Sequence, residues 1–414
     1  MENGNEHTPP STPWATTSLG EYMSATAPAA TFQRLNWYDT MLGAPTGPAV
    51  RAPVGSRHDA RGVLEEILLK ALDTDKPTYV LFSGGRDSSA VLATAASVAR
   101  REGLPDPVPV TMRHPESPES LETSWQELVL RHLKIDDHHV VEMHGEQNLL
   151  GEVGTEAIRR RGPIWPAAVQ GQGALYQHFD CGVVISGEGG DMALDGHRAG
   201  QVRAALERPG RAALRKGLVA LRPAVLTRES LRSELSQSDA GVPRWLRHAG
   251  RQAFIDAAVA MAALPLRWDD TIRMLRRCRA FTVGIANFEA GLAEYGSVSV
   301  NPLADVAFVD ALARDGGAFG WGDRTAVFRR LFGDLLPDKV LARSTKAAFN
   351  STRWGEQERQ FAREWDGHGF DEDWIDAEAL RSEWLAERPH PISGFLLQVA
   401  WAISQGIPVT GDQR

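Results

Sequence analysis

Two short segments rich in glycine, serine and aspartate carry the residues best suited to chemistry in this chain. The first, SGGRDSS at residues 83–89, directly follows the apolar run TYVLF at 78–82. Gly84 and Gly85 let the backbone adopt positive φ and approach a ligand closely. Backbone N–H groups at the mouth of the following helix form an anion site, which the helix dipole reinforces. Three hydroxyls add donors, those of Ser83, Ser88 and Ser89. Asp87 would repel a phosphate unless a cation lay between them, so the segment predicts phosphate bound together with Mg²⁺.

The second segment is SGEGGD at residues 186–191, which follows the apolar run VVI at 183–185. Ligands of open α/β sheets bind outside the carboxyl ends of the strands, so two such loops can meet on one nucleotide. Asp87 and Asp191 would then share Mg²⁺ and stabilise a developing pyrophosphate charge. Either segment alone could be an ordinary glycine turn between a strand and a helix. The two together predict a nucleotide site.

Strands that alternate with helices must position these loops. We predict strands at 78–82, 108–112, 139–143 and 183–186, and helices at 88–101 and 119–133. An earlier helix carries one apolar face, formed by Val63, Leu64, Ile67, Leu68 and Leu72. This alternation predicts the α/β fold class, with a parallel sheet covered by helices on both faces.

Strand signals nearly vanish after about residue 200, and amphipathic segments such as 211–221 and 271–281 indicate a mainly helical second half. We therefore divide the chain into three parts. Residues 1–55 form a disordered or irregular extension and linker, 56–200 an α/β region with both loops, and 201–414 a helical substrate-binding region.

Composition limits the class of protein. The net charge of −8 argues against a nucleic-acid-binding protein. The two cysteines fit a reducing cytosol and suit neither a metal cluster nor a disulfide scaffold. No apolar run is long enough to span a bilayer, and no secretory signal opens the chain. We expect a cytoplasmic protein with no membrane partner.

The two loops in this order resemble those of the synthetase domain of the asparagine synthetase family. Its members have a PP-loop and cleave ATP between the α and β phosphates. The similarity covers roughly 61–349 and includes VPVTMRHPESPE at 108–119, NPLAD at 301–305 and LLP at 335–337. The segment RSTKAAF at 343–349 resembles the family's Arg, Lys and Phe pattern. The chain is also similar to the β-lactam synthetase and lasso-peptide cyclase branches.

This resemblance implies ATP and Mg²⁺ as cofactors and a role for each matched residue. It implies that the ATP phosphates are held by Ser83, Gly84, Gly85, Asp87, Ser88 and Ser89. Phe82 and Met112 would flank the adenosine, and Ser186 and Gly187 would touch the nucleotide. Glu188 would support the acyl-adenylate, and Asp87 with Asp191 would bind Mg²⁺. Lys346 matches a lysine that steadies negative charge during attack on the adenylate. The alternative interpretation is that Lys346 is a surface lysine between helices.

Three departures from the family pattern bear on the substrate. Met192 stands where the family has a second acid, and Val298 and Val300 replace a Glu-x-Arg pair. Glu294 and Tyr295 lie nearby and are possible substitutes as a catalytic pair, although such residues are more often structural. These changes put aspartate in doubt as the substrate.

The front of the chain also departs from the family, because residue 2 is Glu rather than the glutaminase cysteine. We expect no glutaminase domain, so nitrogen would come from free ammonia, a separate glutaminase or pathway protein, or an amine.

The leading prediction is an AMP-forming ligase of specialised biosynthesis that joins a small-molecule or peptide carboxylate to ammonia or an amine. Alternatives are a macrolactam (lasso-type) cyclase, an adenylation-driven epimerase, a modifier of transfer RNA and an inactive homologue.

Overall fold

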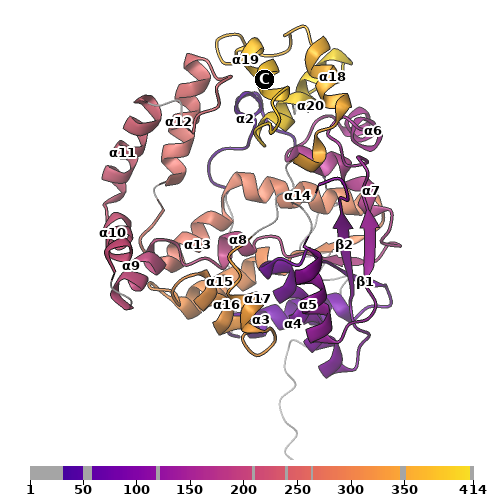
Figure 1. The fold of residues 1–414 in the computed structure, drawn as a ribbon, viewed down its shortest axis with the longest axis vertical. Coiled ribbons are helices and arrows are strands. Elements are labelled where there is room, and N and C mark those ends of the chain that lie inside the picture. Colours follow the sequence, from indigo (N-terminus) through magenta and orange to yellow (C-terminus); the bar gives the residue numbers. More distant parts are fainter. Residues whose placement is uncertain are drawn as a thin grey trace, which may run out of the picture.

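A five-stranded parallel sheet lies toward one side of the molecule, on the right of Figure 1, where β1 and β2 are labelled. The computed structural model describes residues 31–49, 58–117, 122–207, 210–237, 241–262, 264–345 and 351–410. The strand order is β3-β2-β1-β4-β5, and every neighbouring pair is parallel. The strands are β1 Thr78–Leu81, β2 Val108–Arg113, β3 His139–Glu142, β4 Val183–Ile185 and β5 Val298–Val300. The predicted α/β class and its parallel sheet are confirmed.

The sequence did not predict β5. Its three residues are too few to show an alternating pattern, and tertiary pairing defines it instead. Val298 pairs with Val183 in register, and the Val298 N–H donates to the Gly182 carbonyl at 2.9 Å. The Ser186 N–H donates to the Val300 carbonyl at 3.0 Å. This pairing places residue 301 beside the 186–191 loop.

Alternate side chains of the strands enter two different hydrophobic layers, as expected for a sheet covered on both faces. Val80, Val183 and Ile185 pack in a layer with α3 Ala60–Leu72, α4 Arg86–Glu102 and α15 Val306–Gly316. Tyr79 and Val184 pack on the other side with α7 Gly173–Tyr176 and α14 Arg279–Glu294. The apolar face predicted on the helix before β1 is the buried face of α3.

Helices dominate the rest of the chain, as the sequence indicated. Near the sheet lie α5 Thr123–Leu133, α6 Glu152–Arg161, α8 Gly190–Ala193, α13 Trp268–Arg276, α16 Arg324–Phe332 and α17 Asp338–Leu341. Short 3-10 turns cover Ala167–Gln172, Pro302–Ala304 and Ser351–Arg353. On the left of Figure 1, across the molecule from β1 and β2, lie α9 His197–Glu207, α10 Arg211–Ala220, α11 Ala224–Gln237 and α12 His248–Ala262.

A second hydrophobic core lies apart from the sheet. It is built around Trp245, Trp365, Trp384 and Phe395, which are at most 4 % exposed. Its elements include α2 Trp37–Leu42, α18 Glu356–Glu364, α19 Ala377–Trp384 and α20 Ser393–Ser404. Within the described residues, the sheet with its two layers forms one packed region, and this core, which includes the C-terminal helices, forms another.

The amphipathic segment at 271–281 is two helices, α13 and α14, with a break at Arg277 and Cys278. The break arises because the backbone there pairs with residues 47–49. The Ala49 N–H donates to the Arg277 carbonyl at 2.5 Å, and the Arg279 N–H donates to the Gly47 carbonyl at 3.0 Å. Of the predicted helix at 119–133, residues 119–121 lie outside the described part. Of the predicted extension and linker at 1–55, residues 1–30 and 50–55 also lie outside it.

None of the helices in the described ranges is both long and apolar enough to cross a membrane.

Candidate functional site

The loop at residues 83–89, here called the first loop, turns from β1 into α4. Gly84 has φ +83°, which favours glycine, and Gly85 begins α4 without a side-chain cap. The hydroxyls of Ser83 and Ser88 lie 3.1 Å apart at this turn. An uncapped N-terminus of a long helix beside two hydroxyls is suited to binding an anion.

The outer side of the first loop is held by neighbouring elements. Gln126 Nε2 donates to the Ser83 carbonyl at 3.1 Å, and Arg343 Nη1 donates to the Gly84 carbonyl at 2.8 Å. Arg343 also forms a buried ion pair with Glu122. Two carbonyls are thereby fixed toward α5 and Arg343, so the loop is rigid before any ligand arrives.

The loop at residues 186–191, here called the second loop, packs directly on the first. A Cβ on Gly187 would meet the Ser88 nitrogen at 2.8 Å, and one on Gly190 would meet Asp87 Oδ1 at 2.3 Å. Glycine is therefore needed at both positions for close approach of the two loops. The sequence showed the glycines, but only the packing explains which contacts require them.

Asp87 and Asp191 converge on a single cation, the guanidinium of Arg324. Arg324 Nη2 lies 2.6 and 2.7 Å from the two carboxylate oxygens of Asp87 and 3.0 Å from Asp191 Oδ1. Two convergent carboxylates at a phosphate site fit Mg²⁺, which usually takes one or two carboxylates plus phosphate oxygens and water. Within the described residues, no set of three or more His, Cys, Asp or Glu side chains could hold a metal ion. A bound Mg²⁺ would therefore need ligands from the nucleotide as well.

A second guanidinium adds positive charge at the same place. Arg86 and Arg324 lie over the ring of Phe328, at 5.2 and 5.3 Å from its centroid. Burial and the neighbouring Arg324 lower the pKa of Arg86. Two clustered cations at a helix N-terminus favour a multiply charged anion such as a polyphosphate.

A polar chain links the second loop to α14. Ser186 Oγ donates to Asn301 Oδ1 at 2.5 Å, and Asn301 Nδ2 donates to Glu289 Oε1 at 3.1 Å. The Glu188 N–H donates to Ser186 Oγ at 3.1 Å, and the Glu188 side chain is exposed. Glu289 thus brings a carboxylate to the loop from a helix in which the sequence analysis had not marked it.

Among the buried polar atoms that have no hydrogen-bond partner within the described residues are Arg353 Nη1, Tyr176 Oη and Gln147 Oε1. Gln147 Nε2 donates to Met112 Sδ at 3.2 Å, which places the amide next to the end of β2. Burial lowers the pKa of Arg353 to about 10. Burial raises the pKa of Tyr176, and Glu188 raises it further, while Arg161 and Arg353 lower it. Because unpaired buried polar atoms are costly, these donors and this acceptor are suited to receiving a polar ligand.

The other residues predicted to contact the nucleotide include Phe82, Met112 and Ser89. The Phe82 ring is only 2 % exposed and belongs to the core, so its backbone is the part that can meet a nucleotide. Met112 is half-buried at the end of β2. Ser89 is fully buried, and its hydroxyl has no hydrogen-bond partner in the described part of the chain. The ligand contacts of these residues remain predictions.

Glu294 and Tyr295 lie at the end of α14, just before β5 begins. Ser186 and Asn301 lie at the opposite ends of the strands, directly after β4 and β5. Glu294 Oε2 pairs with Arg161 at 2.6 Å and with Arg160 at 3.6 Å. The Tyr295 ring packs edge-on against Tyr176, with centroids 5.9 Å apart. A catalytic role for this pair remains a prediction. Lys346 lies outside the described residues.

The comparisons agree with this geometry. The model of the asparagine synthase family matches residues 59–295, more than half of the chain. The chain therefore belongs to the asparagine synthase family, whose members are ATP-dependent amide-forming ligases. The matched region includes both loops and the strands β1 to β4, and it ends just before β5. No curated protein gave a significant match.

Sequence reasoning missed several residues that the structure places at the site: Glu122, Gln126, Glu289, Arg324, Arg343 and Arg353. None lies in either loop, and each reaches the site from a helix or turn distant in sequence. Arg343 could have been marked, because it lies in the RSTKAAF segment that carried part of the resemblance.

Proposed function

We propose that this chain activates a carboxylate with ATP as an acyl-adenylate, releases pyrophosphate, and transfers the acyl group to ammonia or an amine. One observation carries the proposal. Asp87 and Asp191, from separate loops, converge on one cation beside the uncapped N-terminus of α4. Adenylation needs charge compensation at this place, because negative charge develops on the pyrophosphate that leaves.

The first half-reaction would use both loops. An oxygen of the acid attacks the α-phosphorus, and the bond from that phosphorus to the bridging oxygen of pyrophosphate breaks. The α4 N-terminus and the guanidiniums of Arg86 and Arg324 are placed to hold the phosphates. Asp87 and Asp191 would hold Mg²⁺, which offsets charge on pyrophosphate when bound. Positioning by the rigid loops supplies much of the remaining effect.

The second half-reaction would use the polar chain that ends at Glu289. The amine nitrogen attacks the acyl carbon, and AMP leaves with the electron pair of the broken carbon–oxygen bond. The amine must lose a proton, and we assign its acceptance to Glu289, which Asn301 holds beside the second loop. Lys346 would steady the negative charge that forms during this attack.

The acid itself would bind near Arg353. Its unpaired Nη1, with Tyr176 Oη and Gln147 Oε1, provides donors and an acceptor for a polar substrate that carries an anionic group. Val298 and Val300 lie in β5, so the Glu-x-Arg pair that the family places there cannot act in this chain. We therefore infer an acid other than aspartate, which favours a role in specialised biosynthesis.

ATP–pyrophosphate exchange with Mg²⁺ over a panel of amino acids, β-amino acids and carboxylate-bearing peptides tests the proposal. We expect exchange that depends on one class of acid and that is lost in Asp87→Asn and Asp191→Asn. Asp136→Asn, an exposed aspartate on another surface, is the matched control. Near-normal exchange in either site variant, or no exchange with any acid in protein that binds ATP, would contradict the proposal.

Product analysis with the active acid then identifies the nucleophile. A linear amide indicates ammonia or a separate amine, and a cyclised product indicates the macrolactam reaction. Deuterium uptake with no amide would indicate epimerisation instead. Arg353→Gln should raise KM for the acid at least about tenfold with the KM for ATP unchanged, and Arg353→Lys should restore part of the loss.

A further inference from the structure

Helix α10 is packed with its small residues inward and its large residues outward. Gly217 and Ala220 are the buried residues of this helix, and a Cβ on Gly217 would lie 2.7 Å from Ala205 Cβ of α9. Leu214 and Leu218 are 48 % and 68 % exposed. A surface helix normally turns its large apolar residues toward the core, so this arrangement leaves an apolar face that no other described residue covers.

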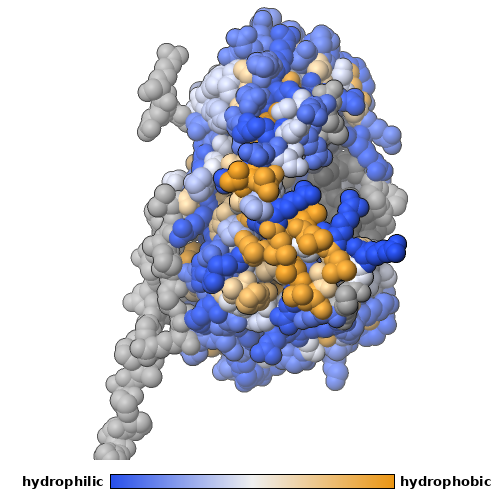
Figure 2. Space-filling view, turned by 90° about the vertical axis from the view of Figure 1, so that its left-hand side faces the viewer, coloured by the Kyte–Doolittle hydropathy of each residue, from blue (hydrophilic) through white to orange (hydrophobic). Residues whose placement is uncertain are grey.

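The exposed face continues beyond α10, and we call it the α10 patch. It consists of Leu206, Leu214, Leu218, Val219, Leu221, Val225 and Leu226. These are seven of the thirteen large apolar side chains that are exposed in the described ranges. Figure 2, which faces the side of the molecule that carries α10–α12, shows extensive apolar surface bordered by polar residues. A concentration of this kind marks an interaction site.

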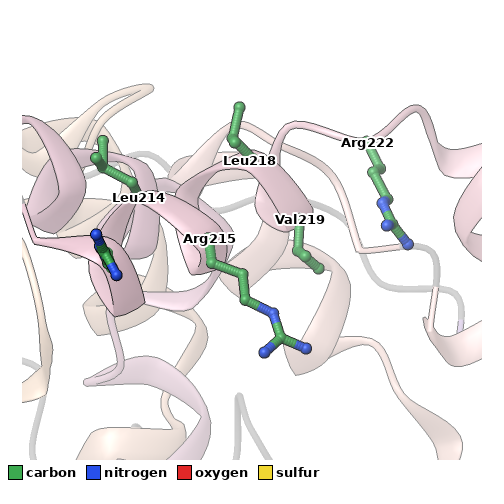
Figure 3. A pocket seen from close by; sticks show the side chains of 6 residues that line it. Leu214, Arg215, Leu218, Val219 and Arg222 are labelled. Carbon is green, nitrogen blue, oxygen red and sulfur yellow. The ribbon is translucent and has the colours of Figure 1, made fainter.

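Arginines lie within the α10 patch rather than only around it. A groove of about 630 Å³ is lined by Arg211, Leu214, Arg215, Leu218, Val219 and Arg222 (Figure 3). The residues at 211, 214, 215 and 218 have the spacing of one helix face, so arginine and leucine alternate along it. Among the described residues, no hydrogen bond or ion pair engages these three guanidiniums.

The backbone under the groove is firmly held. Arg198 of α9 donates to the Ala220 carbonyl at 2.9 and 2.6 Å, to the Arg222 carbonyl at 2.6 Å and to the Leu264 carbonyl at 2.5 Å. The end of α10 is thereby fixed against α9 and the segment after α12. The groove is a built surface, so a partner would meet it without first ordering it.

Charge indicates which partner fits. Residues 208–228 hold six Arg or Lys and no Asp or Glu, in a chain of net charge −8. A second copy would bring the same cations against each other, which disfavours self-pairing. An interfacial membrane helix keeps its cations on the face opposite the apolar one, unlike the alternation seen here. The chain's own residues 1–30 hold three glutamates, but Glu2 and Glu6 are separated from Glu21 by a segment with three prolines, so they do not form one acidic amphipathic helix.

We propose that the α10 patch binds an acidic amphipathic helix of a second polypeptide. The large apolar side chains of that partner helix would pack on the patch, and its carboxylates would pair with Arg211, Arg215 and Arg222. A helix laid in an apolar groove is a common mode of recognition. The arginines would give register and rapid association, and the apolar side chains would give most of the affinity.

The test uses the full chain and two labelled synthetic helical peptides with the same leucine pattern. One has glutamate between the leucines and the other has lysine. In fluorescence anisotropy we expect the glutamate peptide to bind and the lysine peptide not to bind. The triple variant Arg211→Glu, Arg215→Glu, Arg222→Glu should weaken binding at least about tenfold. The control is a triple reversal of exposed cations elsewhere: Lys76→Glu, Arg131→Glu and Arg330→Glu.

A photo-reactive residue at position 218, in cells that make the protein, tests the natural partner. We expect an adduct with another polypeptide, mapped to an acidic segment and lost in the patch variant. Four results would overturn the proposal: an adduct within the protein's own residues 1–30, a dimer that the patch variant abolishes, binding to phosphatidylserine vesicles that the patch variant weakens, or neither peptide binding nor an adduct. ATP binding should be unchanged in both triple variants, which separates this test from that of the proposed function.

Discussion

The buried pair of Arg343 and Glu122 supports a prediction that joins stability to nucleotide binding. The two side chains are 3 % and 6 % exposed, and Arg343 Nη1 lies 3.0 Å from Glu122 Oε2 and 2.8 Å from the Gly84 carbonyl. The guanidinium also lies over the Trp125 ring, 4.6 Å from its centroid. Arg343→Met keeps much of the side-chain volume but leaves the carboxylate of Glu122 buried without its cation.

Breaking one side of a buried ion pair costs about 3–5 kcal/mol, because the remaining charge stays desolvated. At roughly 2 °C per kcal/mol for a large chain, the midpoint of thermal unfolding should fall by about 6–10 °C. The double variant Glu122→Gln, Arg343→Met removes the buried charge as well and should regain at least about 2 kcal/mol. Arg131→Met, an exposed arginine on α5, is the control and should change stability by less than about 0.5 kcal/mol.

Differential scanning calorimetry and ATP titration measure the two effects separately. Both the single and the double variant lose the hydrogen bond to the Gly84 carbonyl, so ATP affinity should stay low in both even though stability recovers in the double. A single variant that costs less than about 1 kcal/mol, or a double variant less stable than the single, would refute the argument that the pair is electrostatically coupled. Full ATP affinity in the double variant would refute the role assigned to Arg343 in holding the first loop.

Three further predictions follow from the site and the histidines. Gly190→Ala should lower ATP–pyrophosphate exchange at least about tenfold, because the new Cβ would lie 2.3 Å from Asp87 Oδ1. The control is Gly210→Ala, whose Cβ would meet nothing within 4 Å. Normal exchange in Gly190→Ala would contradict the packing of the two loops. Glu289→Gln should spare that exchange but slow amide formation by about 10²–10⁴-fold if the carboxylate accepts the amine proton, and equal loss of both steps would show a structural role instead. Burial lowers the pKa of three histidines, so near and below about pH 6.5 the unfolded chain binds more protons than the folded chain. The midpoint temperature of thermal unfolding should therefore be lower at pH 5 than at pH 7. An equal or higher midpoint temperature at pH 5 would contradict this. The three histidines are His114, His138 and His197.

The four predicted strands were found within a residue of their expected ends, because each is a short apolar run bounded by polar or glycine-rich residues. Helix α4 was equally evident, since it follows the glycines of the first loop and ends at Gly103, which has φ +70°. β5 was missed because three residues carry no periodic signal, and its strand geometry comes from pairing with β4. The break between α13 and α14 was missed for a similar reason, because residues 47–49 supply the competing hydrogen bonds.

The sequence by itself determined the α/β class, the family, and the two loops with Asp87 and Asp191. These are local patterns, in which residue type and spacing act on the backbone of the same segment. Only the tertiary structure decided what surrounds the loops. Arg324, Arg343 and Glu289 reach them from segments distant in sequence, and the buried Arg353 Nη1 has no hydrogen-bond partner among the described residues. A side chain's partner depends on which segments pack together, and long-range packing leaves no period or spacing in the chain that could be read in advance.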